Sequence, residues 1–102
     1  MLTNFKTYQL AVELYNTCDG IKARAYIKDQ LMRASLSIVL NLAEGSAKPQ
    51  DKERRRFYAI ALGSLRETQA LLSLLKQERA FAQANTVGGY VFRLVYPRNP
   101  VP

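Results

Sequence analysis

Long stretches without proline or glycine constrain this chain more than any other sequence feature. Among its 102 residues, no proline precedes Pro49, and the first 62 positions contain only two glycines, Gly20 and Gly45. These two residue types most often interrupt regular structure, so their scarcity favours long helices joined by short connections. We therefore predict an all-α chain.

Apolar residues at helical spacing locate the first two helices. The first is predicted from about Asn4, a good N-cap residue, to about Cys18. The second is predicted from Arg24 to Glu44, and Gly45 is expected just past its end in a left-handed conformation.

The third helix is predicted from near Pro49 to about Gln77. Gly63 lies in its middle and is expected to let another backbone approach closely. In the last quarter, Gly88 and Gly89 precede a run that also permits a strand, so we expect a short or irregular fourth helix. Residues 1–96 are predicted to form one domain, and residues 97–102 a proline-rich tail.

The second predicted helix is apolar on more than one face. Its inner stripe includes Leu31, and a second face lies about 100–180° away from that residue at 100° per residue. Little other protein is left in so short a chain to cover that face. We therefore predict a homo-oligomer interface at Met32, Leu36, Leu40 and Ala43.

Two segments resemble one protein family. Residues 30–45, QLMRASLSIVLNLAEG, resemble the QirRAxxSIxxNIAEG signature of the bacterial four helix bundle protein family, first recognised in intervening sequences of large-subunit ribosomal RNA genes. Residues 56–67, RFYAIALGSLRE, look like its RFxxIAxGSLxE stretch. The resemblance covers about residues 4–78 and implies an up-and-down four-helix bundle that assembles into a ring-like homopentamer. A related branch comprises retroelement accessory proteins that engage a reverse transcriptase and nucleic acid, and no enzymatic activity is attached to the family.

The basic residues suggest a nucleic-acid interface. The net charge is +7, and a helix that starts by Lys48 would carry Lys48, Lys52, Arg55 and Arg66 within about 60° of one another. Such a stripe can contact successive phosphates, although a solvated face partly neutralised by nearby acidic residues is the alternative. The predicted nucleic-acid-binding residues are Lys48, Lys52, Arg54, Arg55, Arg56 and Arg66.

A polar cluster in the two family segments has two interpretations. It is either a ligand site or a structural network that satisfies helix ends and interfaces, and we favour the network because buried polar groups must be hydrogen-bonded. This structural polar motif comprises Arg33, Asn41, Glu44, Gly45, Gly63, Ser64 and Glu67.

The composition excludes several functional classes. The chain has no histidine and one cysteine, Cys18, so histidine-based catalysis and an internal disulfide are excluded. We expect no catalytic residues, no metal, no cofactor and no membrane span, and a cytoplasmic location. The expected function is a non-enzymatic, oligomeric accessory protein that binds RNA, DNA or a ribonucleoprotein. The alternative is a homo-oligomeric scaffold or protein-interaction module without nucleic-acid binding.

Overall fold

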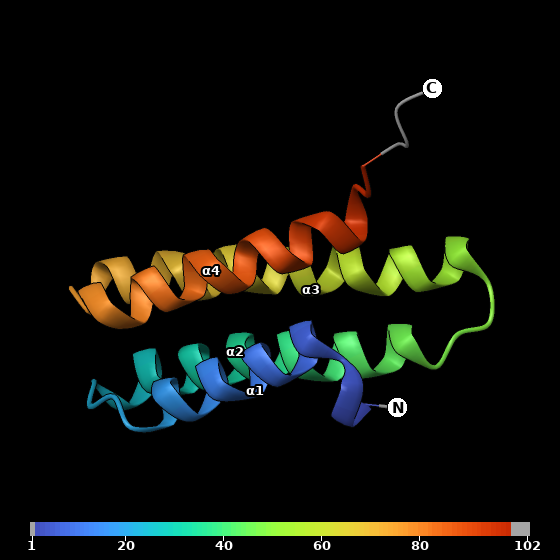
Figure 1. Ribbon diagram of the computed structural model, residues 1–102. Coiled ribbons are helices and arrows are strands. Elements are labelled where there is room, and N and C mark those ends of the chain that lie inside the picture. The colour runs from blue at the N-terminus through green and yellow to red at the C-terminus, as the bar shows by residue number, and fades with distance from the viewer. Residues whose placement is uncertain (1, 99–102) are drawn as a thin grey trace.

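The computed structural model describes residues 2–98, which form an antiparallel up-and-down bundle (Figure 1). A short 3-10 helix, η1 (Leu2–Asn4), precedes four α-helices: α1 (Lys6–Asp19), α2 (Ala25–Ser46), α3 (Asp51–Leu74) and α4 (Glu78–Val95). Each helix packs beside the next one in the chain, and α4 returns beside α1. The all-α prediction and the bundle implied by the family resemblance are both confirmed. Of the predicted tail, residues 99–102 lie outside the described residues.

The bundle closes around a continuous apolar core. Large side chains from all four helices are fully buried in it, including Leu14, Leu31, Leu65 and Val91. Two buried hydroxyls bond back to their own helices: Ser35 donates to the Leu31 carbonyl at 2.8 Å, and a second such bond is made on α3. Among the described residues no buried side-chain polar atom lacks a partner, as a stable core requires.

The start of α1 differs from the prediction. Asn4 belongs to the preceding 3-10 turn, and Phe5 occupies the N-cap position without a side-chain cap. At the other end of α1, the Lys28 ammonium donates to the carbonyls of Cys18, Asp19 and Ile21. A cation there satisfies carbonyls that a helix C-terminus leaves unpaired, so Lys28 joins the start of α2 to the end of α1.

Gly45 has a different role from the one we predicted. It lies inside α2, and no described glycine has a positive φ, so the left-handed conformation is wrong. A Cβ at this position would lie 2.7 Å from Cε1 of Tyr58 and 3.1 Å from the Arg54 carbonyl oxygen. Tyr58 is itself buried. Glycine is required at position 45 because the Tyr58 ring of α3 packs directly on the α2 backbone.

Gly63 is the opposite case. It is exposed, and a Cβ there would meet no atom within 4 Å, so no other helix of this chain approaches it closely. The expected close approach therefore occurs at Gly45 and not at Gly63. A helical glycine alone cannot distinguish the two cases, because the distinction depends on which way each one faces.

The fourth helix is complete, contrary to the expectation of a short or irregular one. α4 has 18 residues and continues through Gly88 and Gly89. Its buried residues Ala84, Val87, Val91 and Val95 recur at helical spacing against the core. Burial of this stripe outweighs the strand preference of the local run.

Alanine substitutions at the two glycines are expected to have opposite effects. Gly45→Ala should lower the melting temperature, since overpacking against buried groups costs about 1–3 kcal/mol. Gly63→Ala should raise it, because alanine exceeds glycine by about 1 kcal/mol in helix propensity and the new methyl group meets open space. Thermal unfolding followed by circular dichroism measures both. A Gly45→Ala variant that melts above Gly63→Ala would contradict the close packing at Gly45.

Candidate nucleic-acid interface

The six predicted basic residues do not form one stripe. α3 begins at Asp51, so Lys48 lies between the helices and cannot extend the α3 face. Its ammonium forms an ion pair with Glu44 at 3.1 Å and lies 5.2 Å from the centre of the Phe57 ring. Lys48 is therefore partly neutralised and is held at the end of α2.

Arg54 closes the turn between α2 and α3. Its guanidinium donates to the Lys48 carbonyl at 3.1 and 3.2 Å and to the Pro49 carbonyl at 3.3 Å. It also forms an ion pair with Asp51 at 3.2 Å. These bonds occupy most of the guanidinium donors, so Arg54 is a structural residue of this turn.

The other predicted basic residues are exposed and lie on different sides of α3. Lys52, Arg55 and Arg56 are all on its first turns. The Arg56 guanidinium lies 5.8 Å from the Phe57 ring centre, on the side that Lys48 also faces. Arg55 instead lines a cavity of about 320 Å³. The other residues that line it are Asp51, Arg54 and Tyr58 of α3, Arg93 and Leu94 of α4, and Pro97.

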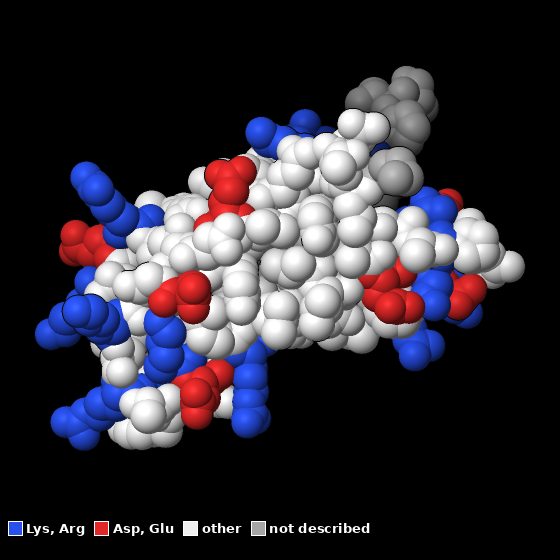
Figure 2. All heavy atoms as spheres, turned by 90° about the horizontal axis from the view of Figure 1, so that it is seen from below, with Lys and Arg blue, Asp and Glu red and all other residues white. Residues whose placement is uncertain are grey.

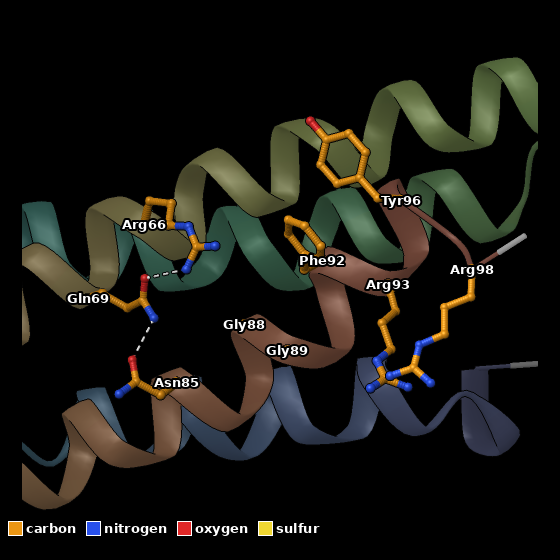
Figure 3. Close-up of a pocket in the computed structure, with 9 residues that line it drawn as sticks. All are labelled: Arg66, Gln69, Asn85, Gly88, Gly89, Phe92, Arg93, Tyr96 and Arg98. Carbon is orange, nitrogen blue, oxygen red and sulfur yellow. Dashed lines mark hydrogen bonds between the residues drawn. The ribbon is translucent and has the colours of Figure 1, made fainter.

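A second and larger cavity, of about 490 Å³, lies between α3 and α4 (Figure 3). We call these two adjoining cavities the α3–α4 groove. α3 supplies Arg66 and Gln69 to the larger cavity, and the remaining lining residues are Asn85, Gly88, Gly89, Phe92, Arg93, Tyr96 and Arg98. Arg93 lines both cavities and so connects them.

A hydrogen-bonded chain of side chains crosses this groove. Arg66 Nη1 donates to Gln69 Oε1 at 3.0 Å, and Gln69 Nε2 donates to Asn85 Oδ1 at 2.8 Å (Figure 3). α4 approaches closely here, because a Cβ at Gly88 would lie 3.4 Å from the Gln69 amide nitrogen. These two hydrogen bonds link the Arg66 side chain to α4 and orient the Arg66 guanidinium along the groove.

Most of the arginines of the groove carry uncompensated charge. In the part of the chain that the structure describes, ion pairs join only Lys48 to Glu44 and Arg54 to Asp51. Five arginines line the groove, and one of them, Arg54, pairs with Asp51, which also lines the smaller cavity. The other four, Arg55, Arg66, Arg93 and Arg98, have no acidic partner among the described residues. Positive charges that line a concave surface raise the local concentration of anions.

The α4 half of this site was not predicted from the sequence. Asn85, Gly89, Phe92 and Arg93 share one face of α4 at spacings of three and four residues, and Tyr96 follows at the C-cap of this helix. That periodicity is present in the sequence, but it has meaning only if residues 78–95 form a helix. Because a short or irregular fourth helix was expected, this half of the site was not recognised.

The predicted polar motif divides into a hydrogen-bonded seam and exposed charges. Ser37 and Ser64 share a 2.7 Å hydrogen bond between α2 and α3, and Asn41 Nδ2 donates to the Ser37 carbonyl at 2.9 Å. Arg33 and Glu67 are exposed and form no side-chain hydrogen bond or ion pair within residues 2–98. The motif therefore supplies a polar seam between α2 and α3, together with the Glu44 ion pair and the Gly45 contact.

The predicted oligomer face is partly uncovered in the single chain. Leu36 and Leu40 are 39% and 56% exposed, whereas Met32 packs against the core and Ala43 is half-buried. Figure 2 views the molecule from the side of α1 and α2. Lysines and arginines gather at its two ends, and the middle is largely uncharged. This face lacks the dense charge that keeps a helix surface solvated.

Cys18 belongs to the core. Burial raises the pKa of its thiol to about 11, against the opposing effects of a hydrogen bond with Ser35 and the charge of Lys28. The thiol is thus protonated at neutral pH and packs as a small apolar group. Within the described residues, no three acidic or cysteine side chains converge to hold a metal ion, and no helix has the length and apolarity of a membrane span.

Comparison with known proteins agrees with the two motifs in α2 and α3. No curated protein and no solved structure matches the chain significantly. The sequence profile of the family described as 23S rRNA-intervening sequence protein matches residues 4–87, from the 3-10 turn to the middle of α4. The chain therefore belongs to the 23S rRNA-intervening sequence protein family.

Proposed function

We propose that this protein is a non-enzymatic accessory protein that binds nucleic-acid phosphates, acts in the cytoplasm and works as an oligomer. The observation that carries the proposal is the α3–α4 groove, in which Arg55, Arg66, Arg93 and Arg98 have no acidic partner among the described residues. Lys52 is exposed at the start of α3 and lines neither cavity.

The spacing of the arginines suits a polyanion better than a single phosphate. Arg55 and Arg66 are eleven residues apart on α3, about 16 Å along its axis at 1.5 Å per residue. At about 3.4 Å per nucleotide, this distance corresponds to roughly five nucleotide steps. Guanidinium contacts to phosphate carry no sequence information, so the proposed binding is sequence-independent.

The scaffold function remains a second candidate because one specific observation favours self-association. Leu36 and Leu40 stay exposed in the single chain, and burying a leucine fully contributes roughly 1.5–3 kcal/mol. The family resemblance implies five copies. An oligomer would repeat the groove on every subunit, so individually weak phosphate contacts would gain avidity. A scaffold would use the same face without binding nucleic acid.

Loss of the groove arginines should weaken nucleic-acid binding and flatten its salt dependence. We expect this of the triple variant Arg55→Gln, Arg66→Gln, Arg93→Gln, measured with a mixed-sequence duplex DNA and a mixed-sequence RNA at several salt concentrations. Each lost contact lowers the slope of log affinity against log salt by about 0.9 for duplex DNA and about 0.7 for single strands.

A charge-matched variant separates the groove from general basicity. The control variant Lys22→Gln, Arg24→Gln, Arg79→Gln also removes three positive charges. These charges lie near the α1–α2 and α3–α4 connections, at the opposite end of the bundle (Figure 1). This control should retain near wild-type affinity. Equal loss in both variants would mean that the groove is not the interface. If the wild type binds neither polymer at low salt, the scaffold function replaces the proposal.

Self-association has its own test. Light scattering at micromolar concentration should give a mass several times 11.6 kDa. Leu36→Glu with Leu40→Glu should lower that mass while helicity is retained, because carboxylates cannot be buried unpaired in an apolar interface. Leu74→Glu is the control, since Leu74 is 77% exposed near the end of α3 and outside the predicted face. A monomeric wild type would refute self-association.

A further inference from the structure

Two large aromatic side chains lie exposed beside the arginines of the α3–α4 groove. Phe92 is 45% exposed and Tyr96 is 60% exposed, and their ring centres are 4.9 Å apart at an interplanar angle of 45°. Both rings line the same cavity as Arg66, Arg93 and Arg98. In Figure 3 the rings lie between Arg66 on one side and Arg93 with Arg98 on the other.

Gly89 of α4 leaves room beside these rings. A Cβ at Gly89 would meet no atom within 4 Å, whereas Gly88 is buried and a Cβ there would lie 3.4 Å from the Gln69 amide nitrogen and 3.6 Å from Arg66 Nη1. Because Gly89 carries no side chain, the α4 backbone is exposed at this point of the cavity surface. A planar group can therefore enter the groove beside the aromatic pair.

From this arrangement we propose that the groove selects unpaired strands of nucleic acid. A base stacks on the exposed face of Phe92 or Tyr96, and Arg66, Arg93 and Arg98 contact the flanking phosphates. This inference rests on the proposed function, because it assigns a preference to the same site.

The physical basis of the preference is access to the base faces. In a duplex the bases are stacked on one another, so a duplex offers the groove only its phosphates. An unpaired strand offers phosphates and the faces of its bases, and aromatic side chains stack on these faces with little regard to sequence. The groove supplies partners for both groups, so unpaired strands gain an interaction that duplexes lack.

Removing the rings without removing charge or apolar bulk tests the proposal. Phe92→Leu with Tyr96→Leu should reduce affinity for a mixed-sequence single-stranded oligonucleotide roughly 5- to 100-fold, the range expected for loss of one stacked base. Affinity for the matching duplex should not change, and neither should the salt slope of either complex, since no cation is lost. Tyr26→Leu is the control, because Tyr26 is 67% exposed at the start of α2, outside the groove, and should bind as wild type.

A second variant fills the groove and leaves both rings in place. Gly89→Gln adds a side chain where the structure has open space, so it should weaken single-strand binding without loss of thermal stability. Gly63→Gln is the matched control, since Gly63 is also an exposed helical glycine with no neighbour within 4 Å and it does not line the groove. This control should bind single strands as the wild type does.

The outcomes distinguish this inference from the function on which it rests. Equal losses for single strand and duplex in the ring variant, or unchanged single-strand binding in both groove variants, would overturn stacking while phosphate binding remains. A wild type that binds single strands no better than duplexes would also overturn it. Failure of the wild type to bind either polymer at low salt would overturn both proposals.

Discussion

The contact between the Gly45 backbone and the Tyr58 ring sets how α2 and α3 pack, and the rest of the bundle depends on this pair. The ring occupies the space that any other side chain at position 45 would need, so α3 packs directly on the α2 backbone there. Arg54 closes the adjoining turn by bonding to the carbonyls of Lys48 and Pro49. Farther along, the hydrogen bond between Ser37 and Ser64 continues the same seam.

The packing of α3 on α2 determines which side of α3 is left to line the groove. With one side of α3 against α2, the side that carries Arg55 and Arg66 lies toward α4 and lines the groove. The guanidinium groups gathered there repel one another in the free protein, and a bound phosphate backbone would relieve that repulsion. Leu36 and Leu40 lie on α2, away from the groove residues. These leucines line neither cavity, so assembly through them would not use the groove residues themselves.

Most of the fold could be predicted from the sequence, because long helices with apolar stripes give strong local signals. The first three helices were located to within a few residues at each end. The role of Gly45 could not be predicted, since a glycine near a helix end fits both a left-handed cap and a close helix contact. Only the position of Tyr58 on the neighbouring helix distinguishes the two.

The candidate site was only partly predictable for a related reason. Arg55 and Arg66 could be selected from charge and spacing. Arg93 comes from the segment whose secondary structure was ambiguous, and Arg98 comes from the predicted tail. Arg54 was selected by charge alone, and its bonds to the turn depend on tertiary geometry. Charge patterns therefore identified basic residues without separating those that face solvent from those that hold the chain together.

The claim that nucleic acid binds between α3 and α4 is tested most directly by ultraviolet crosslinking of a uracil-containing single strand, followed by mass spectrometry of the adducts. A base stacked on an aromatic ring is well placed to crosslink to it. We expect adducts at Phe92 or Tyr96, in the segment that carries Arg93. Adducts confined to α1 and α2, with none on α4, would contradict this account.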